Sequence, residues 1–121
     1  MVPMWHSQHM TRYLISFDEG TMLIPDAELP AVGAAAHAVV REAQNAGVWI
    51  FGGGLIGQSA NIVDTDGTIS VGPYPETKAT IGGFSIVDVP SHEVALDWAA
   101  KFAFACRCAQ EVRELMYDPD V

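Results

Sequence analysis

The segment YPETK, residues 74–78, holds the densest group of side chains in this sequence that could bind or react with a ligand. Glu76, Thr77 and Lys78 place a carboxylate, a hydroxyl and an ammonium group within three residues. Lys78 is one of only six basic residues beside 15 acidic ones, so it could draw an anionic substrate to the mouth of a pocket. An alternative of equal weight is that Glu76 and Lys78 are surface charges beside a turn, while Thr77 binds loop backbone groups.

Two aromatic residues could add ring surface to such a site. Tyr74 opens the charged segment, and Trp49 lies in the apolar run VWIF, residues 48–51. Their rings would suit a small aromatic or lactone-like ligand, although an aromatic side chain in an interface core is the commoner situation. The candidate ligand-binding residues are therefore Tyr74, Glu76, Thr77, Lys78 and Trp49.

The cysteines and histidines do not follow a pattern typical of a metal site. Cys106 and Cys108 are spaced C-x-C in a stretch that could be a strand, where both side chains would point to one face. Neighbours at this spacing rarely form a disulfide, and His6, His9, His37 and His92 show no zinc-finger spacing. We expect two small buried thiols and no metal site.

Three consecutive glycines, Gly52 to Gly54, follow the apolar run. Neither a Lys-Ser/Thr pair nor a helix signal comes after them, so they do not form a phosphate-binding loop. A strand exit or bulge, where two backbones approach closely, explains them better. No cofactor is predicted.

The composition limits the classes of partner. A formal net charge of −9 argues against nucleic acid, because phosphate contacts need clustered Lys and Arg. No stretch approaches the roughly 20 apolar residues of a membrane span, and the first ten residues lack a cationic head followed by an apolar run. We therefore expect a cytoplasmic protein without a membrane partner. Half of the residues are hydrophobic, which is high for a small monomer and predicts a subunit interface.

Hydrophobic periodicity predicts the elements of the first half. The segment RYLISF, residues 12–17, alternates with the period of a strand. An Ala-rich helix capped by Asp26 is expected to run to Ala46 and to end at Gly47. Residues 48–51 are apolar throughout, which is typical of a strand covered on both faces.

The second half predicts a hairpin over residues 61–71, with a tight two-residue turn at Asp66-Gly67. A strand over residues 84–89 and an amphipathic helix that begins at Pro90 and Ser91 follow. A last strand is expected within residues 106–116.

This order predicts an α+β ferredoxin-like βαββαβ domain with an antiparallel sheet. Residues 10–121 are expected to form one domain, after a tail of residues 1–9. Because two helices can cover only one face of the sheet, the other face is expected to meet a second subunit. The result would be a homodimer with an interior cavity.

The segment VGPYPETKATIGGF, residues 71–84, resembles the signature of the YCII-related proteins of the DGPF type, D-G-P-F-x-E-T-K-E-x-x-G-G-[FY]. The similarity extends through RYLISFDEG, REAQNAGVWIFGGGL, DTDGTISV and GGFSIVDVPSHEVALDWAAKF, from about Met10 to Leu115. It implies a ferredoxin-like domain that dimerises through its sheets into an α/β barrel. One departure is that Val71 stands where the family motif opens with an acidic residue, and this puts a catalytic role of that carboxylate in doubt.

The same resemblance implies a candidate catalytic pair. A histidine on the first helix is a proposed active-site residue in the YCII branch, and His37 is the position that would inherit this role. Held by a carboxylate such as Asp18, it could act as a general acid or base. The alternative is a solvated or interface histidine on the flank of an amphipathic helix.

Two functions follow as hypotheses. The first is a cofactor-independent enzyme that acts on a small organic molecule in a cavity at the dimer interface. The second is a non-catalytic dimer that binds a small ligand or a regulatory partner, since some DGPF proteins are linked with extracytoplasmic-function sigma factors.

Overall fold

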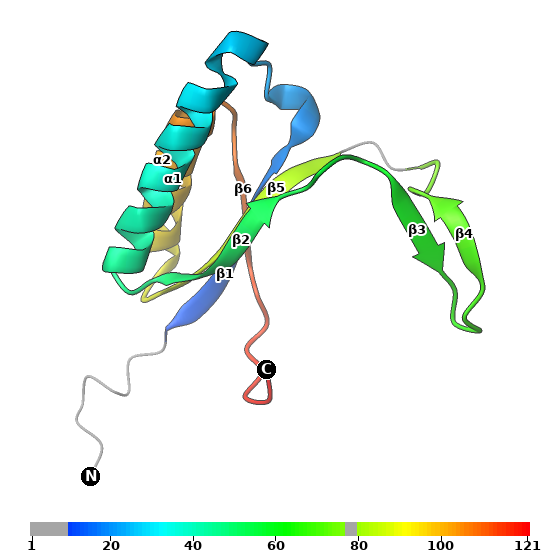
Figure 1. The fold of residues 1–121 in the computed structure, drawn as a ribbon. Coiled ribbons are helices and arrows are strands. Elements are labelled where there is room, and N and C mark those ends of the chain that lie inside the picture. The colour runs from blue at the N-terminus through cyan, green and yellow to red at the C-terminus, as the bar shows by residue number, and fades with distance from the viewer. Residues whose placement is uncertain (1–9, 77–79) are drawn as a thin grey trace.

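The computed structural model describes residues 10–76 and 80–121 of the chain. Figure 1 shows a four-stranded sheet with two helices on one side of it, and a separate hairpin that extends away from both. The strands are β1 Thr11–Asp18, β2 Trp49–Gly54, β3 Ala60–Val63, β4 Ile69–Gly72, β5 Ile81–Val89 and β6 Glu111–Glu114. The helices are α1 Leu29–Asn45 and α2 His92–Cys106, with short 3-10 helices over Glu19–Thr21 and Asp26–Glu28.

The main sheet has the strand order β2-β5-β1-β6, and every neighbouring pair is antiparallel. With α1 between β1 and β2 and α2 between β5 and β6, this arrangement is compatible with a ferredoxin-like fold. The predicted α+β class and antiparallel sheet are therefore confirmed. The hairpin of β3 and β4 is inserted between the second and third strands of the main sheet.

The core lies between the main sheet and the two helices. Tyr13 and Ile15 of β1 alternate toward this side, as do Val87 and Val89 of β5. Such period-two alternation is typical of a strand with one face in a core. The helices supply the rest of the buried cluster, with Ala43 from α1 and Ala95, Trp98, Ala99 and Phe102 from α2.

The ends of the helices differ in part from the sequence prediction. Ser91 Oγ accepts a hydrogen bond from Val94 N at 3.2 Å and so caps α2, as its place before the helix predicts. Gly47 follows α1 with a φ of 76°, as expected of a C-terminal glycine. The cap predicted at Asp26 is wrong, because Asp26 begins a 3-10 helix and α1 starts at Leu29 without a side-chain cap.

The stretch that holds the two cysteines is helical at its start. Cys106 is the last residue of α2, and Arg107, which follows it as the C-cap, has a left-handed φ of 57°. The final strand begins only at Glu111. The strand considered for Cys106 and Cys108 is therefore wrong. Both cysteines are free and buried, as predicted. Burial raises the pKa of the Cys106 thiol and that of Cys108.

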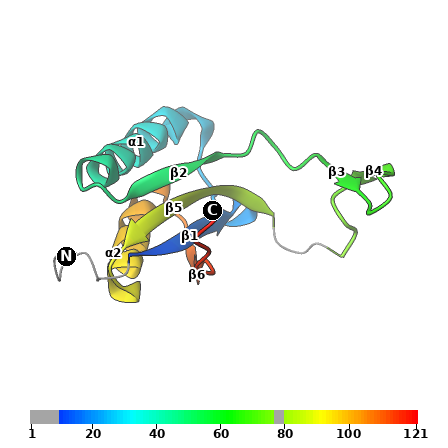
Figure 2. The same ribbon diagram turned by 90° about the horizontal axis from the view of Figure 1, so that it is seen from below.

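The β3–β4 hairpin confirms the prediction over residues 61–71, but its turn is longer than expected. Asp64 N donates to Thr68 O at 2.8 Å and Gly67 N donates to Asp64 O at 2.9 Å. Gly67 has a φ of 87°, so a turn followed by a left-handed residue replaces the predicted two-residue turn. Figures 1 and 2 both show the hairpin beyond the end of the main sheet, away from the helices.

Candidate ligand-binding region at the open sheet face

Neither helix covers the second face of the main sheet, and at one end of this face residues of the C-terminal segment line a concave surface together with Arg12 and Asp88. Directly opposed residues in an antiparallel pair point to the same side, so the register assigns each side chain to a face. Leu14 lies opposite Ile86, Ser16 lies opposite Phe84, and Phe51 pairs with Ile86. These positions alternate with the core residues of β1 and β5, and they form what we call the open face.

The open face has an apolar half on β2 and β5. Phe51 is 63% exposed, and its ring centroid lies 6.1 Å from that of Phe84, which is half-buried. A tilted pair at this distance is a favourable aromatic geometry. Gly53 sits opposite Phe84, and a Cβ there would have no neighbour within 4 Å, so the backbone leaves space beside the rings.

The edge of this face, along β6, is polar. Glu111 lies opposite Ser16 and Arg113 lies opposite Leu14. Arg113 Nη2 donates to Glu111 Oε2 at 2.9 Å, and both side chains are exposed. A ligand on this face would therefore meet aromatic and aliphatic carbon on one side and an ion pair on the other.

The close approach predicted at the glycine run is confirmed at Gly52. A Cβ on Gly52 would lie 2.5 Å from Phe84 O and 2.9 Å from Ser85 Cα, both of them backbone atoms of the neighbouring strand. Only glycine fits there, because real Cβ contacts do not reach such distances. This position sets how tightly β2 joins β5 beside the open face.

Asp18 ties the loop that precedes β5 to the end of β1. Its Oδ1 accepts hydrogen bonds from Gly20 N and Thr80 Oγ1, each at 2.9 Å, and from Thr80 N at 3.4 Å. Glu19 N also donates to Thr80 O at 2.7 Å. The bond from Gly20 N, followed by those from Thr80, holds the pKa of the Asp18 carboxyl below its usual value.

The glycine pair of the motif makes room for an aromatic ring at the same corner. A Cβ on Gly82 would collide with the Phe17 ring, and one on Gly83 would lie 2.9 Å from that ring and from Gly53 O. Phe17 lies opposite Gly83 in the β1–β5 pair. The two glycines therefore let the start of β5 lie close to the Phe17 ring at the end of β1.

The structure places His37 on α1, where the side chain is exposed. Successive helical residues are 100° apart, so His37 lies on the flank away from both the buried Val32 and the groove residue Ala38. In the described part of the chain no hydrogen bond or ion pair joins His37 to Asp18. Since α1 covers the face opposite the open face, the single chain does not bring this histidine to that surface.

The other candidate residues are not gathered in one place either. Tyr74 is 61% exposed and Glu76 is exposed in the loop after β4, while Thr77 and Lys78 lie outside the described residues. Trp49 packs within the chain's own core, with its ring centroid 6.2 Å from that of Phe102. Residues two apart in a regular strand point to the same face. A shift in the pairing between Trp49 and Phe51 instead puts these two side chains on opposite faces of the sheet.

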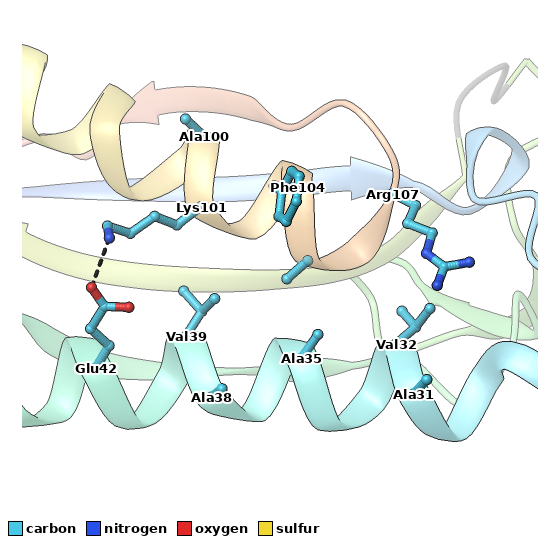
Figure 3. A pocket seen from close by; sticks show the side chains of 11 residues that line it. Ala31, Val32, Ala35, Ala38, Val39, Glu42, Ala100, Lys101, Phe104 and Arg107 are labelled. Carbon is cyan, nitrogen blue, oxygen red and sulfur yellow. Dashed lines mark hydrogen bonds and ion pairs between the residues drawn. The ribbon is translucent and has the colours of Figure 1, made fainter.

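A second concave surface lies between the helices, on the outside of the molecule (Figure 3). This groove has a volume of about 780 Å³. Its floor is formed by small residues of α1, and Phe104 of α2 stands beside it. Lys101 Nζ donates to Glu42 Oε1 at 2.7 Å and Arg107 Nη1 donates to Glu28 Oε1 at 2.6 Å. None of the candidate residues that the structure describes lines this groove.

Sequence reasoning did not name Leu14, Phe51, Phe84 or Ile86 as site residues. A usable signal was present, because residues 12–17 and 84–89 carry large apolar side chains at both odd and even positions. A strand that faces water on one side would be polar at every second residue. The bulge that turns Phe51 to the open face could not be predicted from the run VWIF, because all four of its residues are apolar.

Two other kinds of site are absent from the described residues. Across residues 10–76 and 80–121, no three His, Cys, Asp or Glu side chains are grouped so that they could hold a metal ion. Neither helix of this part of the chain is long and apolar enough to cross a membrane.

The strand order and the two helices on one face make this an α+β domain that is compatible with a ferredoxin-like fold. The family model for the YCII-related domain matches residues 11–117, and the chain belongs to this family. The family predicted from the YPETK region and its surroundings is thereby confirmed. A search of curated proteins finds no significant match.

Proposed function

We propose that this chain works as a homodimer whose two open faces meet and enclose a cavity for a small organic molecule. The observation that carries the proposal is the open face itself, with Phe51 well exposed and Leu14, Phe84 and Ile86 beside it. Leaving such a contiguous apolar surface in water is unfavourable, and burial gains about 25 cal/mol per Å². Two sheets packed face to face, about 10 Å apart, would bury it.

The character of the open face supports the kind of ligand. Small residues, Ser16 and Gly53, flank Phe84 on its two neighbouring strands, so packed sheets would leave space there. The aromatic half offers ring surface, and the Arg113–Glu111 pair offers charge. We infer a compact ligand with an apolar body and one ionised or hydrogen-bonding group, bound without a cofactor.

The observations favour the non-catalytic form of this proposal, a dimer that binds a small ligand and could report it to a regulatory partner such as a sigma factor. Asp18 Oδ1 accepts hydrogen bonds from Gly20 and Thr80, and this arrangement is typical of a side chain that holds a loop in place. The catalytic form keeps His37 as a general acid or base with Asp18 as its carboxylate. It also assigns Tyr74, Glu76, Thr77, Lys78 and Trp49 to ligand binding.

A pair of phenylalanine variants tests the interface. Phe51→Lys puts a charge on the open face, and we expect it to weaken dimerisation at least tenfold, because an unpaired charge would be buried. Phe104→Lys changes a residue that is 90% exposed on the helix layer and should leave the dimer intact. Sedimentation equilibrium measures both. A dimer that survives Phe51→Lys but dissociates with Phe104→Lys would place the interface on the helix layer and would contradict the proposed interface on the open face.

The ligand and the catalytic form are tested with a library of small aromatic and aliphatic acids and lactones. Methyl NMR should show shifts at Leu14 and Ile86 for a binder; shifts confined to Val32, Val39 and Ala35 would assign binding to the helix groove. If any library member is turned over, His37→Gln should abolish that turnover. Unchanged turnover in His37→Gln would remove His37 from the mechanism.

A further inference from the structure

The helix groove, between α1 and α2, lies on the side of the molecule away from the proposed sheet interface. Small residues of α1 at the spacing of helical turns form its floor, Ala31, Ala35 and Ala38. Phe104 of α2 lines the same groove, and its side chain is 90% exposed. One subunit therefore carries both a large exposed apolar side chain and a row of alanines that leaves room for such a side chain.

The two walls of the helix groove carry opposite charges. Glu28 directly precedes α1 and Glu42 lies on it, whereas Lys101 lies on α2 and Arg107 directly follows it. Lys101 pairs with Glu42 at 2.7 Å, and Arg107 pairs with Glu28 at 2.6 Å. All four side chains are about half exposed, so each can meet a further partner. The α1 wall is thus acidic and the α2 wall is basic.

The apolar centre of the groove lies midway between these charges. Phe104 is three residues from Lys101 and three from Arg107, and Ala35 is seven residues from each of the two glutamates. Figure 3 shows Lys101 near one end of the groove, Arg107 near the other, and Phe104 between them. The surface therefore has an apolar middle and two charged ends.

We propose that the helix groove is a second interface between copies of this chain, in which Phe104 packs on Ala35 of the partner subunit. A two-fold axis along the groove would place α2 of each subunit on α1 of the other. The ion pairs show that α1 and α2 run antiparallel, so the four helices would form an antiparallel bundle. This contact is independent of the proposed sheet interface, and the two together would join dimers into a tetramer.

The charges favour this axis over one that crosses the groove. Rotation about the groove direction brings Lys101 to the partner's Glu42 and Arg107 to the partner's Glu28, so a basic wall meets an acidic wall at both ends. An axis across the groove would place one acidic wall on the other. The remaining Asp, Glu, Lys and Arg residues of the two helices do not line the groove: Arg41, Glu93 and Asp97.

The size of this surface makes the association weak. α1 has 17 residues and is therefore about 26 Å long, and two helices side by side are roughly 20 Å wide. The contact would bury on the order of 500 Å² in each subunit, or about 1,000 Å² in total, which is typical of transient interfaces. Phe104 should therefore stay exposed in dilute solution, and tetramers should form only as the concentration rises.

Sedimentation velocity from micromolar to millimolar concentration tests the interface. The wild type should sediment faster as its concentration rises, and Phe104→Lys should weaken this association at least tenfold, roughly, because an unpaired charge would be buried. Gln44→Lys adds the same charge to an exposed residue of α1 outside the groove and should behave like the wild type. A wild type that does not associate further at millimolar concentration would overturn the inference, as would equal association of the two variants.

These outcomes are separate from the fate of the proposed dimer. Phe51→Lys changes the open face and should leave the groove association unchanged at millimolar concentration. Loss of the groove association in Phe104→Lys alone would leave the proposed dimer standing, whereas failure of the sheet interface would leave this test intact.

A mixing experiment tests the arrangement of the charges. Glu42→Lys makes both walls basic at one end of the groove, and Lys101→Glu makes both walls acidic there, so each variant alone should associate about tenfold more weakly than the wild type. An equal mixture should recover the association, because each variant supplies the charge that the other lacks. Energy transfer between differently labelled variants measures it. A mixture that associates no better than either variant alone would overturn the packing of α2 on the partner's α1.

Discussion

At the scale of single residues, Asp18 anchors Thr80, which directly precedes β5, to the end of β1. Its Oδ1 collects three hydrogen bonds from Gly20 and Thr80, across 62 positions of sequence in the case of Thr80. The backbone carbonyl of Thr80 in turn accepts a hydrogen bond from Glu19 N. The chain therefore enters β5 from a fixed point at Thr80.

This anchor predicts a dependence of stability on pH. The folded state lowers the pKa of Asp18 below the ordinary 3.8, so its contribution is complete above that value and is lost as the pH falls through the lower folded pKa. Asp18→Asn should therefore destabilise the protein at pH 7 and match the wild type more closely below about pH 3. Urea unfolding from pH 7 to pH 2.5 measures the difference.

The control for this prediction is Asp97→Asn, which changes an exposed carboxylate on α2. It should leave the free energy of unfolding nearly unchanged across the range, since isolated surface substitutions have small effects. An equal and pH-independent loss in both variants would contradict the role of Asp18 as an ionised anchor.

Single-residue roles were only partly predictable from the sequence. The candidate pair His37 and Asp18 was joined by resemblance, but contacts between distant segments decide what Asp18 bonds to, and its partner is Thr80. Residue types alone also could not say that Trp49 faces the core. The buried thiols of Cys106 and Cys108 were predictable, because their composition and spacing favour burial over pairing or metal binding.

At the scale of elements, β2 is held against β5 by a contact that only glycine permits. A Cβ on Gly52 would collide with backbone atoms of Phe84 and Ser85, whereas one on Gly53 would meet no atom within 4 Å. Of these two adjacent glycines, Gly52 has no space for a side chain, whereas Gly53 does. The motif glycines Gly82 and Gly83 have a related task beside Phe17.

Two alanine substitutions turn this contrast into a prediction. Gly52→Ala should lower the free energy of unfolding by about 1–3 kcal/mol, as overpacking against backbone requires strands to separate. Gly53→Ala should be neutral or slightly stabilising, because alanine restricts the unfolded chain more than glycine does. Thermal or urea unfolding of both variants decides it, and equal effects would mean that β2 and β5 are not this close.

The elements themselves were predicted well where the pattern is long. The strand of residues 12–17, the Ala-rich helix and the helix after Ser91 all carry periodic apolar stripes with clear end signals. The cap at Asp26 and the turn at Gly67 were missed, since a 3-10 helix and a longer turn use the same residue types. The separation of the β3–β4 hairpin from the main sheet depends on tertiary pairing, which no local pattern encodes.

At the scale of the whole molecule, the described residues leave apolar surface uncovered in two places besides the helix groove. One is the open face of the main sheet, and the other is the face of the β3–β4 hairpin that carries Val63, Ile69 and Val71. The sequence predicted an uncovered second face, because two helices can cover only one side. Hydrophobic residues make up 50% of the chain, a fraction that is in line with the proposed subunit interface.

The most direct measurement of the central claim is the solvent accessibility of the open face in the wild-type protein. A soluble paramagnetic agent broadens NMR signals of groups that it can approach. In the proposed dimer, the methyl groups of Leu14 and Ile86 should stay sharp, while the exposed Phe104 ring and the methyl group of Ala100 on the helix layer should broaden. Equal broadening on both surfaces would show that the open face meets water, and it would contradict the dimer.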